Sequence, residues 1–88
     1  MKLKAGFMLK KIIDDYIVVP TGDNIVDFAV AVSLNETGAF LWKELETEKS
    51  FEELVDALSK EYEIAEDEVV EDVKEFVELL KTHSFLQE

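Results

Sequence analysis

The hydrophobic periodicity of this chain changes at Asn35, and that change constrains the fold more than any other feature of the sequence. Before it, residues 28–34 alternate, and the larger side chains on one face are Phe28, Val30, Val32 and Leu34. A period of two residues predicts a strand whose larger side chains face a core. After Asn35, apolar residues recur at three- and four-residue intervals, which is typical of amphipathic helices. The sequence therefore predicts strands first and helices afterwards.

Two shorter β-rich runs come before this strand. Residues 7–13 and residues 16–19 are rich in apolar side chains, and the pair Asp14-Asp15 between them predicts the turn of a β-hairpin. Pro20 closes the second run, because proline has no amide hydrogen to donate. The outer face of residues 28–34 is small and uncharged, so we expect that strand at an edge of the sheet.

The first helix begins after Asn35, whose side chain suits an N-cap. Gly38 is unexpected there, because glycine costs roughly 1 kcal/mol relative to alanine inside a helix. At about 100° per residue, Gly38 falls on the same stripe as Leu41 and Trp42. We therefore interpret Gly38 as a packing residue that lets a neighbouring strand or helix approach closely. Phe40 falls on the opposite face, where we expect it to be exposed.

Two further helices are predicted downstream. Ser50 and Glu53 form the pattern of a capping box, which predicts a helix from there to about residue 61. We expect Tyr62 and Ile64 to enter the core from the connection that follows. The third helix is predicted over residues 66–82, after Ala65, a poor cap. Its stripe consists of Val69, Val73, Phe76, Val77 and Leu80, with Val70 on the flank.

The charge of the chain limits its partners. Nine lysines and no arginine stand against 21 acidic residues, which gives a net charge of −12. Residues 1–20 hold four lysines and two acidic residues. Residues 21–60 hold three lysines and nine acidic residues, and residues 61–88 hold two lysines and ten acidic residues. Nucleic-acid binding requires a basic footprint that neutralises phosphates. The helical part of this chain would repel them instead.

Length, cysteine content and hydropathy further limit the class of protein to which the chain can belong. We expect the 88 residues to form a single domain, 1–88. The absence of cysteine excludes disulfides and thiolate metal sites. The first residues lack the apolar core of a secretory signal, and no apolar run approaches the ~20 residues that cross a bilayer. We therefore expect a cytoplasmic protein.

No pattern in the sequence predicts catalysis. His83, the single histidine, stands near the end of the third helix, where we expect it at the surface, beside terminal carbonyls. Paired acids such as Glu52-Glu53 fit the cap of a helix, and the three glycines are isolated, so no phosphate-binding loop is present. We expect no enzymatic activity, no cofactor and no metal ion.

Together these elements predict an α+β domain of winged-helix type, in which a three-stranded antiparallel sheet is followed by three helices. What remains as a functional feature is a binding surface. The third strand can accept another strand through main-chain hydrogen bonds, and the acidic helices favour partners that carry lysine or arginine. Two other functions stay open: a winged-helix nucleic-acid-binding regulator, and a self-associating adaptor that uses Phe40 and the edge strand.

The stretch around Gly38 also carries a family resemblance. Residues 34–42 (LNETGAFLW) resemble the signature of the PqqD-like family. The similarity continues through residues 50–55 (SFEELV) and the acidic helix at residues 71–76, and upstream through residues 16–20 (YIVVP). It covers nearly the whole chain, from about residue 7 to residue 86.

This resemblance implies a RiPP recognition element, a non-catalytic peptide chaperone of the PQQ-biosynthesis protein D type. Such domains hold the leader segment of a ribosomally made precursor peptide and deliver it to a separate maturation enzyme, such as a radical-SAM protein. The leader docks as an added strand on the third strand, in a groove beside the third helix.

The resemblance also implies which residues bind the peptide. On the strand they are Phe28, Ala29, Val30, Ala31, Val32 and Ser33. On the third helix they are Val70, Val73, Phe76, Val77 and Leu80, although the sequence does not specify which flank of that helix faces the groove. The implied partners are a precursor peptide and a maturation enzyme, without nucleic acid or membrane, for a monomer or weak dimer.

Overall fold

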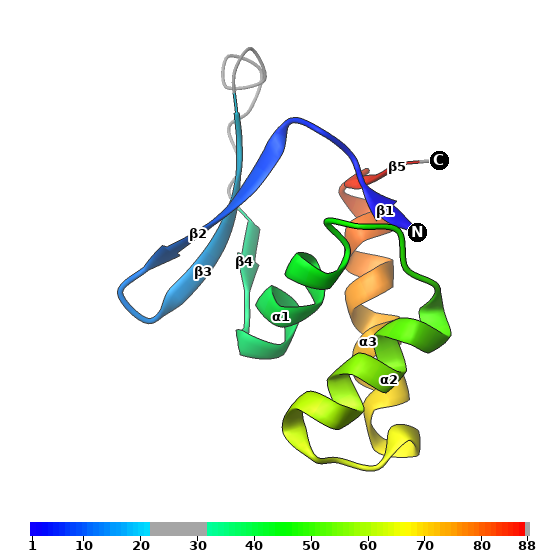
Figure 1. Ribbon diagram of the computed structural model, residues 1–88. Coiled ribbons are helices and arrows are strands. Elements are labelled where there is room, and N and C mark those ends of the chain that lie inside the picture. The colour runs from blue at the N-terminus through cyan, green and yellow to red at the C-terminus, as the bar shows by residue number, and fades with distance from the viewer. Residues whose placement is uncertain (22–31, 88) are drawn as a thin grey trace.

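Three of the strands form a sheet that lies to one side of the helices, and the other two pair separately, as Figure 1 shows. The computed structural model describes residues 1–21 and 32–87. In chain order its elements are β1 (Lys2–Leu3), β2 (Phe7–Ile12), β3 (Asp15–Pro20), β4 (Val32–Leu34), α1 (Glu36–Glu44), α2 (Phe51–Tyr62), α3 (Glu66–Thr82) and β5 (Leu86–Gln87). This order confirms the predicted α+β architecture, a three-stranded antiparallel sheet followed by three helices.

The hairpin of β2 and β3 turns one residue earlier than its sequence predicts. Ile12 pairs with Asp15, so the turn consists of Ile13 and Asp14 and not of Asp14 and Asp15. Residues opposite each other in an antiparallel pair point to the same face of the sheet. The observed register places Leu9 opposite Val18, which is 1% exposed. A turn at Asp14-Asp15 would place the charged Lys11 there, so burial decides the register.

The third strand of the sheet, β4, lies at its edge, as predicted, because the strand order is β2-β3-β4. Ser33 is exposed, whereas Val32 and Leu34 on either side of it are buried. This alternation confirms the inward face predicted for these two residues. The earlier part of the predicted strand, residues 28–31, lies outside the described residues.

Helix α1 begins as predicted, with Asn35 as its N-cap. Asn35 Oδ1 accepts a hydrogen bond from the backbone N–H of Gly38 at 2.7 Å. Gly38 is buried, and a Cβ atom added to it would lie 3.0 Å from that Oδ1 atom and 3.4 Å from Cβ of Leu34. The close neighbours that explain the glycine are therefore the capping side chain and the last residue of β4.

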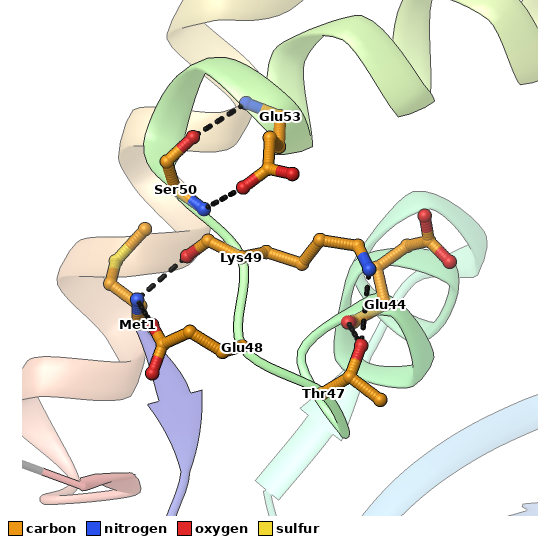
Figure 2. A network of polar contacts seen from close by, with 7 residues as sticks. All are labelled: Met1, Glu44, Thr47, Glu48, Lys49, Ser50 and Glu53. Atoms are coloured by element: carbon orange, nitrogen blue, oxygen red, sulfur yellow. Dashed lines mark hydrogen bonds and ion pairs between the residues drawn. The ribbon is translucent and has the colours of Figure 1, made fainter.

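Helix α2 begins with the predicted capping box, which Figure 2 shows at close range. The hydroxyl of Ser50 accepts from the backbone N–H of Glu53 at 3.1 Å, and the Glu53 carboxylate accepts from the N–H of Ser50 at 2.8 Å. Just before this cap, Lys49 donates its N–H to the carbonyl of Met1 at 2.9 Å. The residue directly before the cap of α2 is thus hydrogen-bonded to Met1, the residue directly before β1.

Two predictions about side chains near α2 are wrong. Phe40 is half-buried and not exposed, because it packs edge-on against Tyr62, with 6.1 Å between the ring centroids. Ile64 is 39% exposed and does not enter the core. Tyr62 packs against the core as expected, but it is half-buried and is the last residue of α2, not part of the connection that follows; burial raises the pKa of its hydroxyl.

Helix α3 matches its predicted bounds and its predicted buried stripe. All five residues of that stripe are buried: Val69, Val73, Phe76, Val77 and Leu80. Ala65 at the N-cap makes no side-chain hydrogen bond, and the acidic first turn of the helix follows it directly. Acidic side chains favour this end of the helix dipole.

The pairing of β1 with β5 has no counterpart among the sequence predictions. Leu3 lies opposite Leu86 in a short antiparallel pair that brings the two ends of the described chain together (Figure 1). Beside this pair, Phe85 is 1% exposed, and its ring centroid lies 4.7 Å from that of Phe7 and 5.6 Å from that of Trp42. The segment that follows α3 therefore packs back onto the core.

Candidate functional site

A cleft of about 210 Å³ lies where the edge strand, the start of α1 and one flank of α3 meet. β4 and α1 follow each other directly in the chain, whereas α3 lies after α2, so the cleft forms only when α3 packs against the other two elements. Its lining consists of Ser33, Leu34, Asn35, Thr37, Gly38, Leu41, Asp72, Glu75, Phe76 and Leu79.

The wall from α3 consists of four residues on one side of that helix. Asp72, Glu75, Phe76 and Leu79 are spaced i, i+3, i+4 and i+7, which places them along one helical face. Phe76 is 6% exposed and Leu79 is half-buried, whereas both acids are exposed. The wall is therefore apolar toward the core and acidic toward solvent.

The opposite wall consists of the end of β4 and the first turn of α1. Ser33 is the exposed residue of β4, and it lies beside the buried Leu34 at the edge of the sheet. Asn35 is held in place because its Oδ1 accepts from the Gly38 N–H and, at 3.0 Å, from the hydroxyl of Thr37. This wall is uncharged, and the side chains of Asn35 and Thr37 are held in place by the hydrogen bonds of the helix cap.

Of the strand residues implied by the family resemblance, two lie in the described part of the chain. Ser33 lines the cleft, whereas Val32 is 7% exposed and belongs to the core. The remaining four lie outside the described residues: Phe28, Ala29, Val30 and Ala31.

Of the helix residues implied by the resemblance, Phe76 alone is among those that line this cleft. Val73 and Leu80 are 0% exposed and so cannot touch a ligand in this conformation. Val70 and Val77 fall on the other side of the buried stripe, about 100–120° from Phe76 around the helix. The residues of α3 that do line the cleft and were not singled out from the sequence are Asp72, Glu75 and Leu79.

The described residues offer no evident centre for catalysis or metal binding. No group of three or more His, Cys, Asp or Glu side chains is placed to hold a metal ion within residues 1–21 and 32–87. His83 is exposed, and its ring stacks on that of Phe85 at 5.5 Å between centroids. In the same part of the chain, none of the helices combines the length and apolarity needed to cross a bilayer.

Comparison with known proteins identifies related sequences and folds. Residues 24–86 match the family described as coenzyme PQQ synthesis protein D (PqqD). The fold is similar to that of a solved structure described as "TbiB1 in Complex with the TbiA(beta) Leader Peptide", with a TM-score of 0.75 and 25% sequence identity. That alignment covers 99% of this chain and 95% of the other. No curated protein matches the sequence.

Proposed function

Because the chain belongs to the PqqD family, we propose that it is a RiPP recognition element that binds the leader segment of a ribosomally made precursor peptide. The structural similarity to TbiB1, which was solved with a leader peptide bound, supports this proposal. The observation in the molecule itself that carries it is the cleft beside an edge strand. An edge strand offers unpaired main-chain groups that an extended peptide can join.

The proposed mode of binding is strand addition to β4, with the peptide lying between β4 and α3. Main-chain hydrogen bonds to β4 would supply affinity that depends little on sequence, while side chains of the peptide would enter the cleft and supply specificity. On the strand side the proposed contacts are Ser33 of β4 and, from the family resemblance alone, residues 28–31, which lie outside the described residues. On α3 the proposed contacts are Asp72, Glu75, Phe76 and Leu79, because these side chains line the cleft.

We further propose that the domain does no chemistry of its own and presents the bound leader to a separate maturation enzyme, such as a radical-SAM protein. The family membership supports this role. Strand addition leaves the part of the precursor beyond the leader outside the cleft, where a second protein can modify it. The domain would then act by holding the substrate at a high effective concentration near that enzyme.

A titration with leader peptides tests the proposed site. Peptides that tile the precursor encoded nearest to the gene are added to ¹⁵N-labelled protein, and backbone amide shifts are recorded. We expect the shifts to concentrate in β4 and in residues 72–79 of α3. Shifts confined to the β2–β3 hairpin, none of whose residues lines the cleft, would contradict strand addition to β4.

A matched pair of substitutions tests which flank of α3 is used. Leu79 and Val70 are both half-buried, but only Leu79 is among the residues that line the cleft. Truncating an apolar contact in a binding site costs about 1–2 kcal/mol, so we expect Leu79→Ala to weaken peptide binding about tenfold. Val70→Ala should leave binding unchanged. Equal losses of peptide affinity in the two variants would contradict the proposal that the flank of α3 with Leu79 faces the peptide.

A further inference from the structure

We propose that this domain selects leader peptides in which a lysine or arginine lies close to an apolar residue, and that Asp72 and Glu75 recognise the basic side chain. This inference rests on the proposed function and extends it to the class of peptide that is bound. It is carried by the charges and apolar surfaces that the cleft places side by side.

The charge in the cleft is of one sign. Among the residues that line it, Asp72 and Glu75 are the ionisable ones, and both are exposed. Neither carboxylate forms an ion pair within the described part of the chain. They stand three residues apart on one face of α3, where like charges repel each other. A cation bound between them would relieve that repulsion.

The lysines of α3 do not neutralise this surface. At about 100° per residue, Lys74 and Lys81 lie roughly 160° and 140° around the helix from Phe76, on its far side. Lys74 is 4.0 Å from Glu71, which is not among the residues that line the cleft. The sequence adds a second reason, since residues 12–42 contain no lysine or arginine. Lys11 of β2 lies near Leu34 and Asn35 in a separate pocket, where its Nζ is 5.6 Å from the centroid of the Tyr16 ring, and it is not among the residues that line the cleft.

Apolar surface adjoins the two carboxylates. Phe76, Leu79 and Leu41 line the same cleft, with Leu79 half-buried and so still accessible. Lysine and arginine can lay an apolar stem on such a surface while the charged head reaches a carboxylate. In an added strand, residues two apart point to the same side. A basic residue and an apolar residue in that relation could occupy the acidic and apolar parts of the cleft together.

The same charges would act against the wrong peptides. A leader with aspartate or glutamate at this position would bring like charges together, and specificity depends on such penalties as much as on favourable contacts. The remaining polar residues of the cleft, Ser33, Asn35 and Thr37, are neutral and do not offset the carboxylates. The cleft is thus built to distinguish peptides by charge as well as by shape.

Selection from a phage-displayed library of random dodecapeptides tests the inference without knowledge of the natural leader. We expect the unmodified protein to enrich peptides that carry lysine or arginine within two residues of an apolar side chain. The variant Asp72→Asn/Glu75→Gln should enrich apolar peptides without that basic preference. The control variant Glu71→Gln/Glu78→Gln changes the net charge equally on the same helix, at residues that are not among those lining the cleft, and should keep the preference.

Direct binding measurements on the most enriched peptide give the size of the effect. By fluorescence anisotropy, Asp72→Asn/Glu75→Gln should weaken binding about threefold to tenfold, as expected for two exposed ion pairs. The control variant should change it less than twofold. Replacing the basic residue of the peptide with glutamine should abolish the difference between the unmodified protein and Asp72→Asn/Glu75→Gln.

The outcomes separate this inference from the function on which it rests. Enrichment of peptides that bind at β4 without a basic preference would overturn the charge selection and leave leader binding intact. Equal effects of the cleft variant and the control variant would also overturn it, because the charge would then act only through the net charge of the helix. Failure to enrich any peptide would count against both the inference and the proposed function.

Discussion

Replacing Gly38 with alanine tests how the junction between β4 and α1 is packed. Inside a helix alanine is favoured over glycine by roughly 1 kcal/mol, so helix propensity alone predicts that Gly38→Ala stabilises the protein. The surroundings predict the opposite. The added Cβ atom would lie 3.0 Å from Oδ1 of Asn35 and 3.4 Å from Cβ of Leu34, and both distances are shorter than comfortable van der Waals contact.

Neither neighbour can move away without cost. Asn35 Oδ1 accepts hydrogen bonds from the Gly38 N–H and the Thr37 hydroxyl, and losing such a cap costs about 1 kcal/mol. Leu34 is 8% exposed, and its Cβ is fixed by the backbone of β4, so extra volume there costs about 1–3 kcal/mol. Set against the gain in propensity, these terms leave a net loss of about 1–3 kcal/mol.

Urea unfolding followed by circular dichroism measures this loss, which corresponds to a decrease in Tm of roughly 4–8 °C per kcal/mol for a domain of this size. The same substitution in an Asn35→Ala background provides the control, because that background lacks the oxygen nearest to the new Cβ. There we expect Gly38→Ala to cost about 1 kcal/mol less. A Gly38→Ala protein that is as stable as the parent, or more stable, would refute the packing argument.

Three further predictions concern the hairpin turn and the start of α2. Ile13 is 85% exposed and has a φ of 57°, a backbone region that costs an L-residue roughly 1–2 kcal/mol and that asparagine tolerates better. Ile13→Asn should therefore stabilise the protein by about 0.5–1 kcal/mol in urea unfolding. A loss of stability would contradict this, because it would show that contacts of the Ile13 side chain outweigh the backbone strain at that residue. Ser50→Ala should cost about 1 kcal/mol in the same assay, because the cap of α2 is lost. Hydrogen bonds from the backbone and side chain of Ser50 hold the pKa of Glu53 below its ordinary value. A carboxyl whose pKa is lowered by folding contributes stability above its unfolded pKa of ~4.3 and loses that contribution as the pH falls through the folded pKa. Thermal unfolding at neutral and acidic pH should thus show Glu53→Gln destabilised at neutral pH and converging with the parent at the lowest pH; an equal deficit at every pH would contradict this linkage.

The sequence alone determined where most elements begin and end. The change of periodicity at Asn35, the cap at that residue and the capping box at Ser50 all act over a few neighbouring residues. The apolar spacing of α3 acts in the same local way, so its bounds and its buried stripe agree with the structure. Patterns of this kind are readable from the chain because backbone geometry converts sequence spacing directly into a shared face.

Contacts between elements that are distant in sequence decided the rest. Turn chemistry favoured Asp14-Asp15, but the register follows the need to place Leu9, and not Lys11, opposite the buried Val18. Phe40 lies on the outer face of its own helix, yet the ring of Tyr62 at the end of α2 covers part of it. In each case a residue from another element supplies the burial, and no local pattern contains that residue.

In the candidate site, too, the sequence predicts some features and the tertiary structure decides others. A helical wheel identifies the buried stripe of α3 and places residues on its two flanks, but it treats those flanks alike. Only the packing of β4 and α1 against α3 selects the flank with Asp72, Glu75 and Leu79 to line the cleft. The sequence therefore determined the family and the elements, whereas the tertiary structure decided which side chains face the cleft, because that choice depends on how separate elements meet in space.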